Sequence, residues 1–148
     1  MNRDTRVTKS GLLRLTQAQL DALYLGLESR GATPTSDTRG TVLALPGTRV
    51  GGVLRGLARL VVWQGKVFSP GTGDLKNKIT PFRFKSIRAM VYAGASWMDD
   101  REATIIDYSK TSLVARWIRD EIREVAPGLW LGKVFIGRWH AIDFVLEG

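Results

Sequence analysis

Three side chains in the C-terminal half of the chain have the chemistry for proton transfer: Asp107, Glu121 and His140. Asp107 ends an apolar stretch, so its carboxylate faces either solvent or an interior. In an apolar interior, desolvation would raise its pKa and suit it to acid or base catalysis. At the end of a strand, it would instead cap the following turn. His140 is the only histidine, and a lone histidine on a strand is usually structural. These residues are catalytic candidates, and whether the protein is an enzyme stays open.

The side chains suited to hold a ligand are aromatic and basic. The chain has five tryptophans, and aromatic residues of this size build cores as well as pockets. Trp130 is the strongest candidate, because it lies in a strand pattern and Gly132 beside it would allow close approach. Lys66 would bind an acidic head group, or form a Schiff base if desolvated, and otherwise extends into solvent. The predicted ligand-binding residues are Lys66, Tyr92, Tyr108, Trp117, Arg119, Arg123 and Trp130.

A dense charged cluster occupies residues 119–124. In a strand, Arg119, Glu121 and Arg123 would share one face. Turned inward, they would form a buried network and an anchor for a carboxylate ligand. Turned outward, they would be a solvated face that contributes little to stability. In a helix, they would be surface pairs.

Composition excludes several classes of site. The chain has 148 residues, the usual size of one domain, and no cysteine, so it has neither disulfides nor a cysteine-based zinc site. A single histidine argues against a histidine-rich metal centre, and no Gly-x-Ser-x-Gly nucleophile motif occurs. We therefore expect no metal and no cofactor. No transmembrane stretch is present and the N-terminal apolar run is too short for a secretory signal, which favours a cytoplasmic protein.

The net charge of +8 raises nucleic acid as a partner. The strongest local signal is residues 76–88, where basic side chains alternate with aromatic ones that could stack on bases. No known nucleic-acid-binding pattern accompanies this segment. A basic rim around a barrel mouth would explain the same residues and would attract an anionic amphiphile. The residues concerned are Lys76, Lys78, Phe82, Arg83, Phe84, Lys85 and Arg88.

Two amphipathic helices are predicted in the N-terminal part. Thr16 and Gln19 form a capping box, and apolar residues then recur at helical spacing up to Leu27. Residues 31–41 have the composition of a loop, and Thr41 to Leu45 is a short strand candidate. The second helix is predicted over residues 50–62, with an apolar face opposite Arg55 and Arg59.

The remaining chain has the pattern of antiparallel strands separated by turns. Strands are predicted at residues 63–68, 75–80, 88–93, 103–108, 129–136 and 139–146, with turn residues between them. Residues 114–125 are ambiguous, because their apolar positions fit a helix well. We predict a strand there, since a short turn at Ala126, Pro127 and Gly128 leads to the next strand and the neighbouring strands need a partner.

The order of four segments, residues 63–68, Asn77, residues 106–108 and residues 118–132, resembles a set of uncharacterised bacterial proteins of similar length. The organisation is also similar to lipocalin-like β barrels, in which a Trp/Gly/Lys segment opens the barrel. The resemblance covers roughly residues 40–146. It implies a cavity for an apolar molecule and supplies no reaction.

We therefore expect an α+β fold: an antiparallel β meander or small lipocalin-like barrel, preceded by two short amphipathic helices. It would be a single domain over residues 1–148, with 1–11 flexible, 16–62 mainly helical and 63–146 mainly β. The first functional hypothesis is binding of a small hydrophobic or acidic amphiphilic molecule in a barrel-like pocket. The alternatives are a small acid/base enzyme, such as a cyclase, isomerase or hydrolase, and single-stranded nucleic-acid binding through residues 76–88. A homo-oligomer formed through the first helix stays open.

Overall fold

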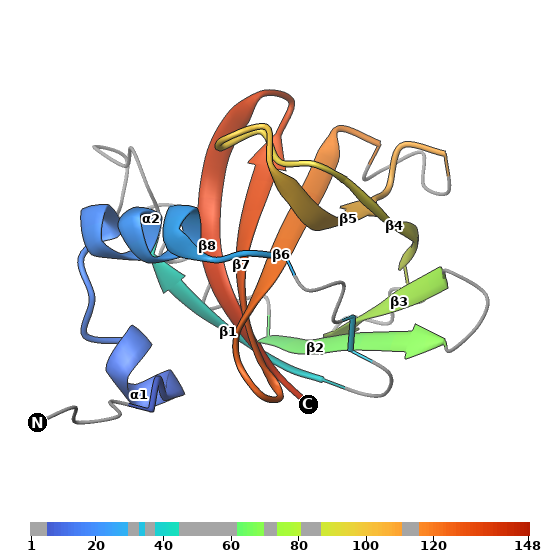
Figure 1. Cartoon of the computed structure of the whole chain (residues 1–148). Coiled ribbons are helices and arrows are strands. Elements are labelled where there is room, and N and C mark those ends of the chain that lie inside the picture. Colours follow the sequence, from blue (N-terminus) through green and yellow to red (C-terminus); the bar gives the residue numbers. More distant parts are fainter. Residues whose placement is uncertain are drawn as a thin grey trace, which may run out of the picture.

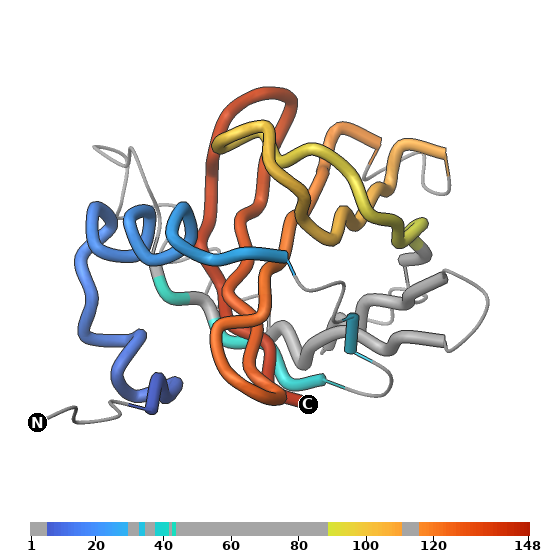
Figure 2. The backbone as a smooth tube through the Cα atoms, viewed as in Figure 1, coloured from blue at the N-terminus to red at the C-terminus, as the bar shows by residue number. Residues whose placement is uncertain are grey.

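The computed structural model of the chain describes residues 6–29, 33–34, 38–44, 62–69, 74–80, 87–110 and 116–148. It has an α+β fold in which one curled antiparallel sheet is flanked by two short helices, as Figures 1 and 2 show. The fold class predicted from the sequence is therefore confirmed. The predicted helix at residues 50–62 lies outside the described residues, except that Val62 already belongs to a strand.

Eight strands form the sheet, in the order β1-β8-β7-β6-β5-β4-β3-β2. From β2 to β8 each strand pairs with its neighbour in sequence, so this part is a meander, and β1 returns to pair with β8. The edge strands β1 and β2 approach each other, but within the described residues no backbone register joins them. The sheet is thus barrel-like and not closed. The strands are Arg39–Ala44 (β1), Val62–Ser69 (β2), Asp74–Thr80 (β3), Ile87–Ala95 (β4), Glu102–Asp107 (β5), Ile118–Ala126 (β6), Leu129–Ile136 (β7) and Trp139–Glu147 (β8).

Apolar side chains pack on both faces of the sheet, because successive strand residues point to opposite sides. The inner, concave face carries one cluster, made of Ala89, Ile106, Tyr108, Ile122, Trp130, Phe144 and Leu146. The outer face carries a second cluster that includes residues of both helices: Leu12, Leu20, Tyr24, Leu129, Leu131 and Val145. The central strands are therefore buried on both sides.

Helix α2, Gln17–Gly26, lies against the outer face beside β8 (Figure 1). Its start is the predicted capping box: the Thr16 hydroxyl accepts from the Gln19 amide, and the Gln19 side chain accepts from the Thr16 amide. These bonds satisfy amide groups that the first turn of a helix leaves without partners. Helix α1, Lys9–Leu12, is not predicted by the sequence and lies partly in the stretch expected to be flexible. Thr8 caps it, and its buried residue Leu12 joins the outer cluster.

Strand β6 confirms the strand prediction for the ambiguous stretch and fixes its bounds at 118–126. Its pairing with β7 places Ile122 opposite Gly132 and Glu124 opposite Trp130, so these residues face the interior. Arg119, Glu121 and Arg123 consequently face the outer side. These three charged residues share one face of β6, as expected for a strand. Trp130 lies on the other face of the sheet.

A tight contact fills the inner face between β7 and β8. Gly132 pairs directly with Phe144, and a Cβ built on Gly132 would lie 2.2 Å from Cζ of the Phe144 ring. The ring therefore occupies the space of the missing side chain, an arrangement in which an aromatic residue covers a strand glycine. The interior next to this pair is packed with side chains.

Candidate functional site

An open groove of about 520 Å³ lies at the end of the sheet where β6 begins and the β7–β8 turn closes. Three of the predicted ligand-binding residues line it, namely Tyr92, Trp117 and Arg119, together with the catalytic candidate Asp107. The remaining lining residues are Trp97, Ser109, Arg116, Ile118, Gly137 and Arg138. The groove thus brings together aromatic and basic residues that are distant in the sequence.

The arginines of the groove stack on its tryptophans. The guanidinium carbon of Arg116 lies 4.7 Å from the ring centre of Trp117, and those of Arg119 and Arg138 lie 4.1 and 4.4 Å from the ring centre of Trp97. Such contacts are favourable, because the negative face of an indole attracts a cation. A stacked guanidinium keeps its N–H groups free to bind a carboxylate or phosphate edge-on.

The three arginines differ in how far their N–H groups are used. Arg119 donates to the carbonyl of Ala95 at 2.7 Å and lies 3.5 Å from the Glu121 carboxylate, while its Nε has no acceptor within the described chain. For Arg116 and Arg138, no hydrogen bond or ion pair to any described residue is present. Two cations that have no acidic partner among the described residues therefore border the groove.

Asp107 contributes the carboxylate of the groove. It accepts hydrogen bonds from the Tyr92 hydroxyl at 3.1 Å and from the Ser109 amide at 2.8 Å. Partial burial alone would raise its pKa, but the hydrogen bonds from Ser109 and Tyr92 and the charge of Arg119 hold the pKa of Asp107 below its ordinary value. Asp107 is therefore ionised at neutral pH, and a carboxylate with a lowered pKa is a weak general base. The bond from Ser109 is the turn cap that the sequence left as the alternative.

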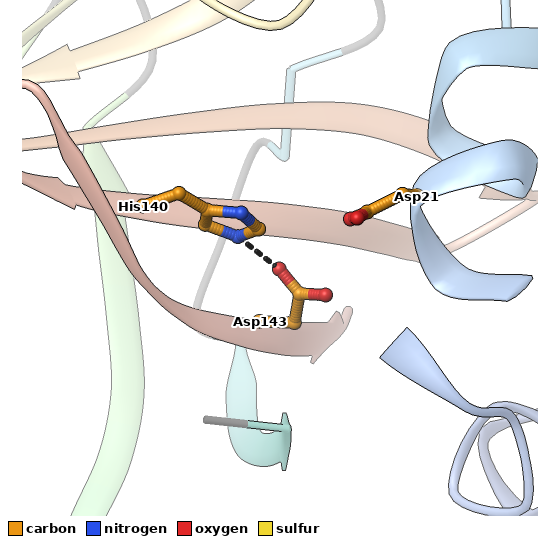
Figure 3. Close-up of side chains that lie close together, drawn as sticks. All are labelled: Asp21, His140 and Asp143. Atoms are coloured by element: carbon orange, nitrogen blue, oxygen red, sulfur yellow. Dashed lines mark hydrogen bonds and ion pairs between the residues drawn. The ribbon is translucent and has the colours of Figure 1, made fainter. Parts of the chain in front are cut away.

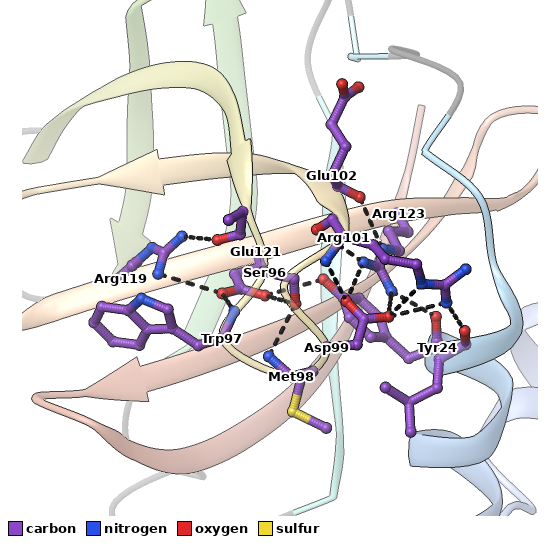
Figure 4. Close-up of polar contacts among 12 residues, drawn as sticks. Tyr24, Ser96, Trp97, Met98, Asp99, Arg101, Glu102, Arg119, Glu121 and Arg123 are labelled. Carbon is purple, nitrogen blue, oxygen red and sulfur yellow. Dashed lines mark hydrogen bonds and ion pairs between the residues drawn. The ribbon is translucent and has the colours of Figure 1, made fainter.

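Glu121, the second catalytic candidate, is buried on the outer face beneath the loop after β4 (Figure 4). Its carboxylate accepts from the Ser96 hydroxyl at 2.5 Å, the Trp97 amide at 2.7 Å and the Tyr24 hydroxyl at 3.2 Å. Burial and the charge of Glu121 raise the pKa of the Tyr24 hydroxyl well above its ordinary value. This network ties helix α2 and the loop to β6.

Arg123 lies two residues after Glu121 on the same face of β6 and is also buried. Its two terminal nitrogens bind the Asp99 carboxylate at 2.9 and 2.7 Å. Its other N–H groups donate to the carbonyls of Tyr24, Arg101 and Glu102. An arginine has five N–H donors, so each donor of Arg123 has an acceptor. The ligand role of Arg123 stays a prediction, and the contacts observed are those of a clamp between α2, the loop and the sheet.

His140, the third catalytic candidate, belongs to a separate cluster shown in Figure 3. Its Nε2 lies 2.5 Å from the Asp143 carboxylate, which also binds the Lys133 ammonium at 2.9 Å and the Gln17 amide at 2.6 Å. Lys133 contacts Asp21 of α2 at 2.5 Å as well. Burial would raise the pKa of Asp21, but the hydrogen bond and charge of Lys133 bring it below its ordinary value.

A change of register in β8 allows this cluster to form. Residues three apart in a regular strand point to opposite faces. Phe135 pairs with His140 and Lys133 pairs with Asp143, so one extra residue bulges out of β8 between these pairs. His140 and Asp143 therefore reach the same face.

Asp21, His140 and Asp143 offer ligand atoms within 4.8 Å of one another, which is a spacing that a metal ion requires. The ammonium of Lys133 already binds both carboxylates and offsets part of their charge. The residues present therefore fit a buried ion-pair network better than a metal centre.

The other predicted ligand-binding residues lie away from the groove. Tyr108 and Trp130 are buried in the inner cluster, where the Tyr108 hydroxyl donates to Asp120 at 3.2 Å. Lys66 belongs to β2, and its side chain lies outside the described residues. The same holds for the side chains of the basic and aromatic segment 76–88, so that interface stays a prediction.

Sequence reasoning missed Trp97, Arg116 and Arg138 of the groove, and Lys133 and Asp143 of the buried cluster. A signal for the first set existed in the adjacent pairs Arg116-Trp117 and Arg138-Trp139. The buried Lys133 had none, because a lone lysine in a strand is normally exposed.

Comparison with known proteins establishes the fold alone. The chain is similar to a crystal structure of a protein from Thermomonospora curvata, with a TM-score of 0.56 and 20% sequence identity over 90% of this chain and 87% of that one. No protein-family model and no curated protein sequence matches the chain. Among the described helices, none has the length and apolar character needed to cross a membrane.

Proposed function

We propose that this protein binds a small acidic amphiphile in the groove. The anionic group is held by Arg116 and Arg138, and the apolar part lies against Trp97 and Trp117. The observation that supports this most is the pair of stacked arginines that have no carboxylate partner within the described chain. A bidentate contact to a carboxylate or phosphate uses the edge of a guanidinium, which stacking leaves accessible.

The proposal retains the class of ligand expected from the sequence and moves its site. A lipocalin-like protein would hold the ligand inside the barrel, whereas Trp130, Phe144 and Tyr108 pack against one another on the inner face. The groove is open, and its tryptophans are more than one third exposed. Large exposed aromatic side chains next to unpaired cations are typical of binding sites rather than cores.

The test is a titration that uses tryptophan fluorescence or calorimetry, with decyl phosphate below its micelle concentration and decanol as the uncharged control. We expect binding of the phosphate and little binding of the alcohol. The double variant R116Q/R138Q should bind at least about tenfold more weakly, because each charge-assisted hydrogen bond contributes about 1.5–3 kcal/mol.

The matched control is R14Q, since Arg14 is exposed and does not line the groove. Equal affinity of the wild type and R116Q/R138Q for decyl phosphate would exclude the groove as the site. Equal affinity for the phosphate and the alcohol would exclude an acidic ligand.

A further inference from the structure

A second surface borders the groove, and we name it the rim: Arg116, Trp117, Ile136, Arg138 and Trp139. Its three apolar side chains are exposed, with 63% of Trp117, 44% of Ile136 and 48% of Trp139 accessible to solvent. Exposure of this extent at neighbouring positions is unusual for a surface without a partner. Only Arg116, Trp117 and Arg138 also line the groove.

Backbone pairing places the rim residues together. Ile118 pairs with Ile136, and Ile136 pairs with Trp139, so these three residues form a row across the ends of β6, β7 and β8 on one face. The Gly137 amide donates to the Trp117 carbonyl at 2.8 Å and joins the segment before β6 to the β7–β8 turn. The inner face of the sheet thus ends in an apolar row in which Ile118 packs against the inner cluster, whereas Ile136 and Trp139 remain exposed.

We propose that the rim docks on the surface of a bilayer that contains anionic lipids. The composition of the rim supports this occupant: two cations, two tryptophans and an isoleucine, with no acidic residue among them. Tryptophan prefers the boundary between head groups and acyl chains, and each arginine near an anionic surface is attracted to it. The net charge of +8 acts in the same direction over longer distances.

Docking in this way would present the groove to the membrane, because Arg116, Trp117 and Arg138 belong to both surfaces. An acidic amphiphile could then pass from the bilayer into the groove without crossing water. The docking itself does not require the proposed function, since the bilayer contacts the apolar row and the arginines whether or not the groove is filled.

The test is co-sedimentation of the full chain with vesicles of phosphatidylcholine alone and with vesicles in which part of it is replaced by phosphatidylglycerol. We expect binding to the anionic vesicles, with a blue shift of tryptophan emission as Trp117 and Trp139 leave water. The variant I136S/W139S should lower the partition coefficient at least about tenfold, from the loss of two buried apolar side chains. R116Q/R138Q should lower it by about fivefold for each arginine.

Two controls separate this proposal from the proposed function. L13S changes a side chain that is 49% exposed on the α1 side and should leave vesicle binding unchanged. Ile136 and Trp139 do not line the groove, so I136S/W139S should keep the affinity for decyl phosphate while losing vesicle binding. Near-ultraviolet circular dichroism checks that the variant is folded.

Any one of the following results would overturn membrane docking. The first is failure of the wild type to sediment with anionic vesicles. The second is equal binding to neutral and anionic vesicles, or equal binding by the wild type and I136S/W139S. The third is a concentration-dependent dimer that I136S/W139S abolishes, because the rim would then be covered by a second copy of the chain.

Discussion

Arg123 and Arg119 lie on the same face of the same strand, and they differ in almost every other respect. Arg123 is buried beneath α2 and the loop after β4, with an acceptor for each of its donors. Arg119 lies where that cover ends; it stacks on Trp97, and its buried Nε has no acceptor among the described residues. The comparison shows that the environment of an arginine here depends on what covers the strand, because the same side-chain direction leads to a buried clamp at one end and to the open groove at the other.

The largest effect should come from removing the clamp. We expect R123M to lower the free energy of unfolding by about 3–5 kcal/mol, because it leaves Asp99 and three carbonyls without their donor. Urea denaturation followed by circular dichroism measures this. The matched variant R116M removes an arginine that has no polar partner among the described residues, and it should stay within about 0.5 kcal/mol of the wild type. Equal losses of unfolding free energy in both variants would show that Arg123 contributes no more to stability than Arg116.

A smaller effect is expected from pH. Hydrogen bonding to Arg123, against a smaller opposing effect of burial, lowers the pKa of Asp99 from 3.8 to about 2. A carboxylate whose pKa is lower in the folded state stabilises the protein at pH values above its unfolded pKa. This contribution, about 2 kcal/mol, is lost as the pH falls from about 4 to about 2.

The variant D99N isolates this contribution, because other carboxylates with lowered pKa values, such as Asp21, titrate in both proteins. Unfolding free energies at a series of pH values should fall more steeply for the wild type than for D99N below about pH 4. Parallel curves would show that the Asp99–Arg123 pair carries no pH-dependent stability.

The effect of removing Arg119 should lie between those of removing Arg123 and Arg116. We expect R119M to cost about 1 kcal/mol, because it removes a modest hydrogen bond to Ala95, a cation–π contact with Trp97 and a long ion pair with Glu121. The same denaturation series measures it, so the three variants should rank in the order Arg123, Arg119, Arg116. If R119M lost as much unfolding free energy as R123M, Arg119 would belong to the buried clamp rather than to the groove.

The strands were predictable from sequence because turn residues separate them at regular intervals, and the capping box located α2. The bounds of β6 were difficult for a physical reason. A strand buried on both faces loses the alternation of apolar and polar residues, and Glu121 and Arg123 are charged although they are buried. Their partners, Ser96 and Asp99, belong to the loop after β4. No local sequence pattern predicts that this loop lies over β6.

The site was predictable only in part for a related reason. Tyr92, Asp107, Trp117 and Arg119 were identified by residue type, and the structure brings them into one groove. Trp130 and Tyr108 have the same types and lie in the core instead. Residue type limits what a side chain can bind, whereas the pairing register decides which face of the sheet it occupies. A single bulge in β8 is enough to move His140 to the other face.

The contact between Gly132 and Phe144 has an evolutionary consequence. Two strands share the volume of one large side chain at this point, so neither residue can change in size by itself. A relative with alanine or a larger residue at position 132 should carry a smaller side chain at position 144, and such paired replacement would mark descent even where overall identity is low. A lineage that replaced the phenylalanine by a small residue while keeping the glycine would gain space beside Trp130, which belongs to the same cluster.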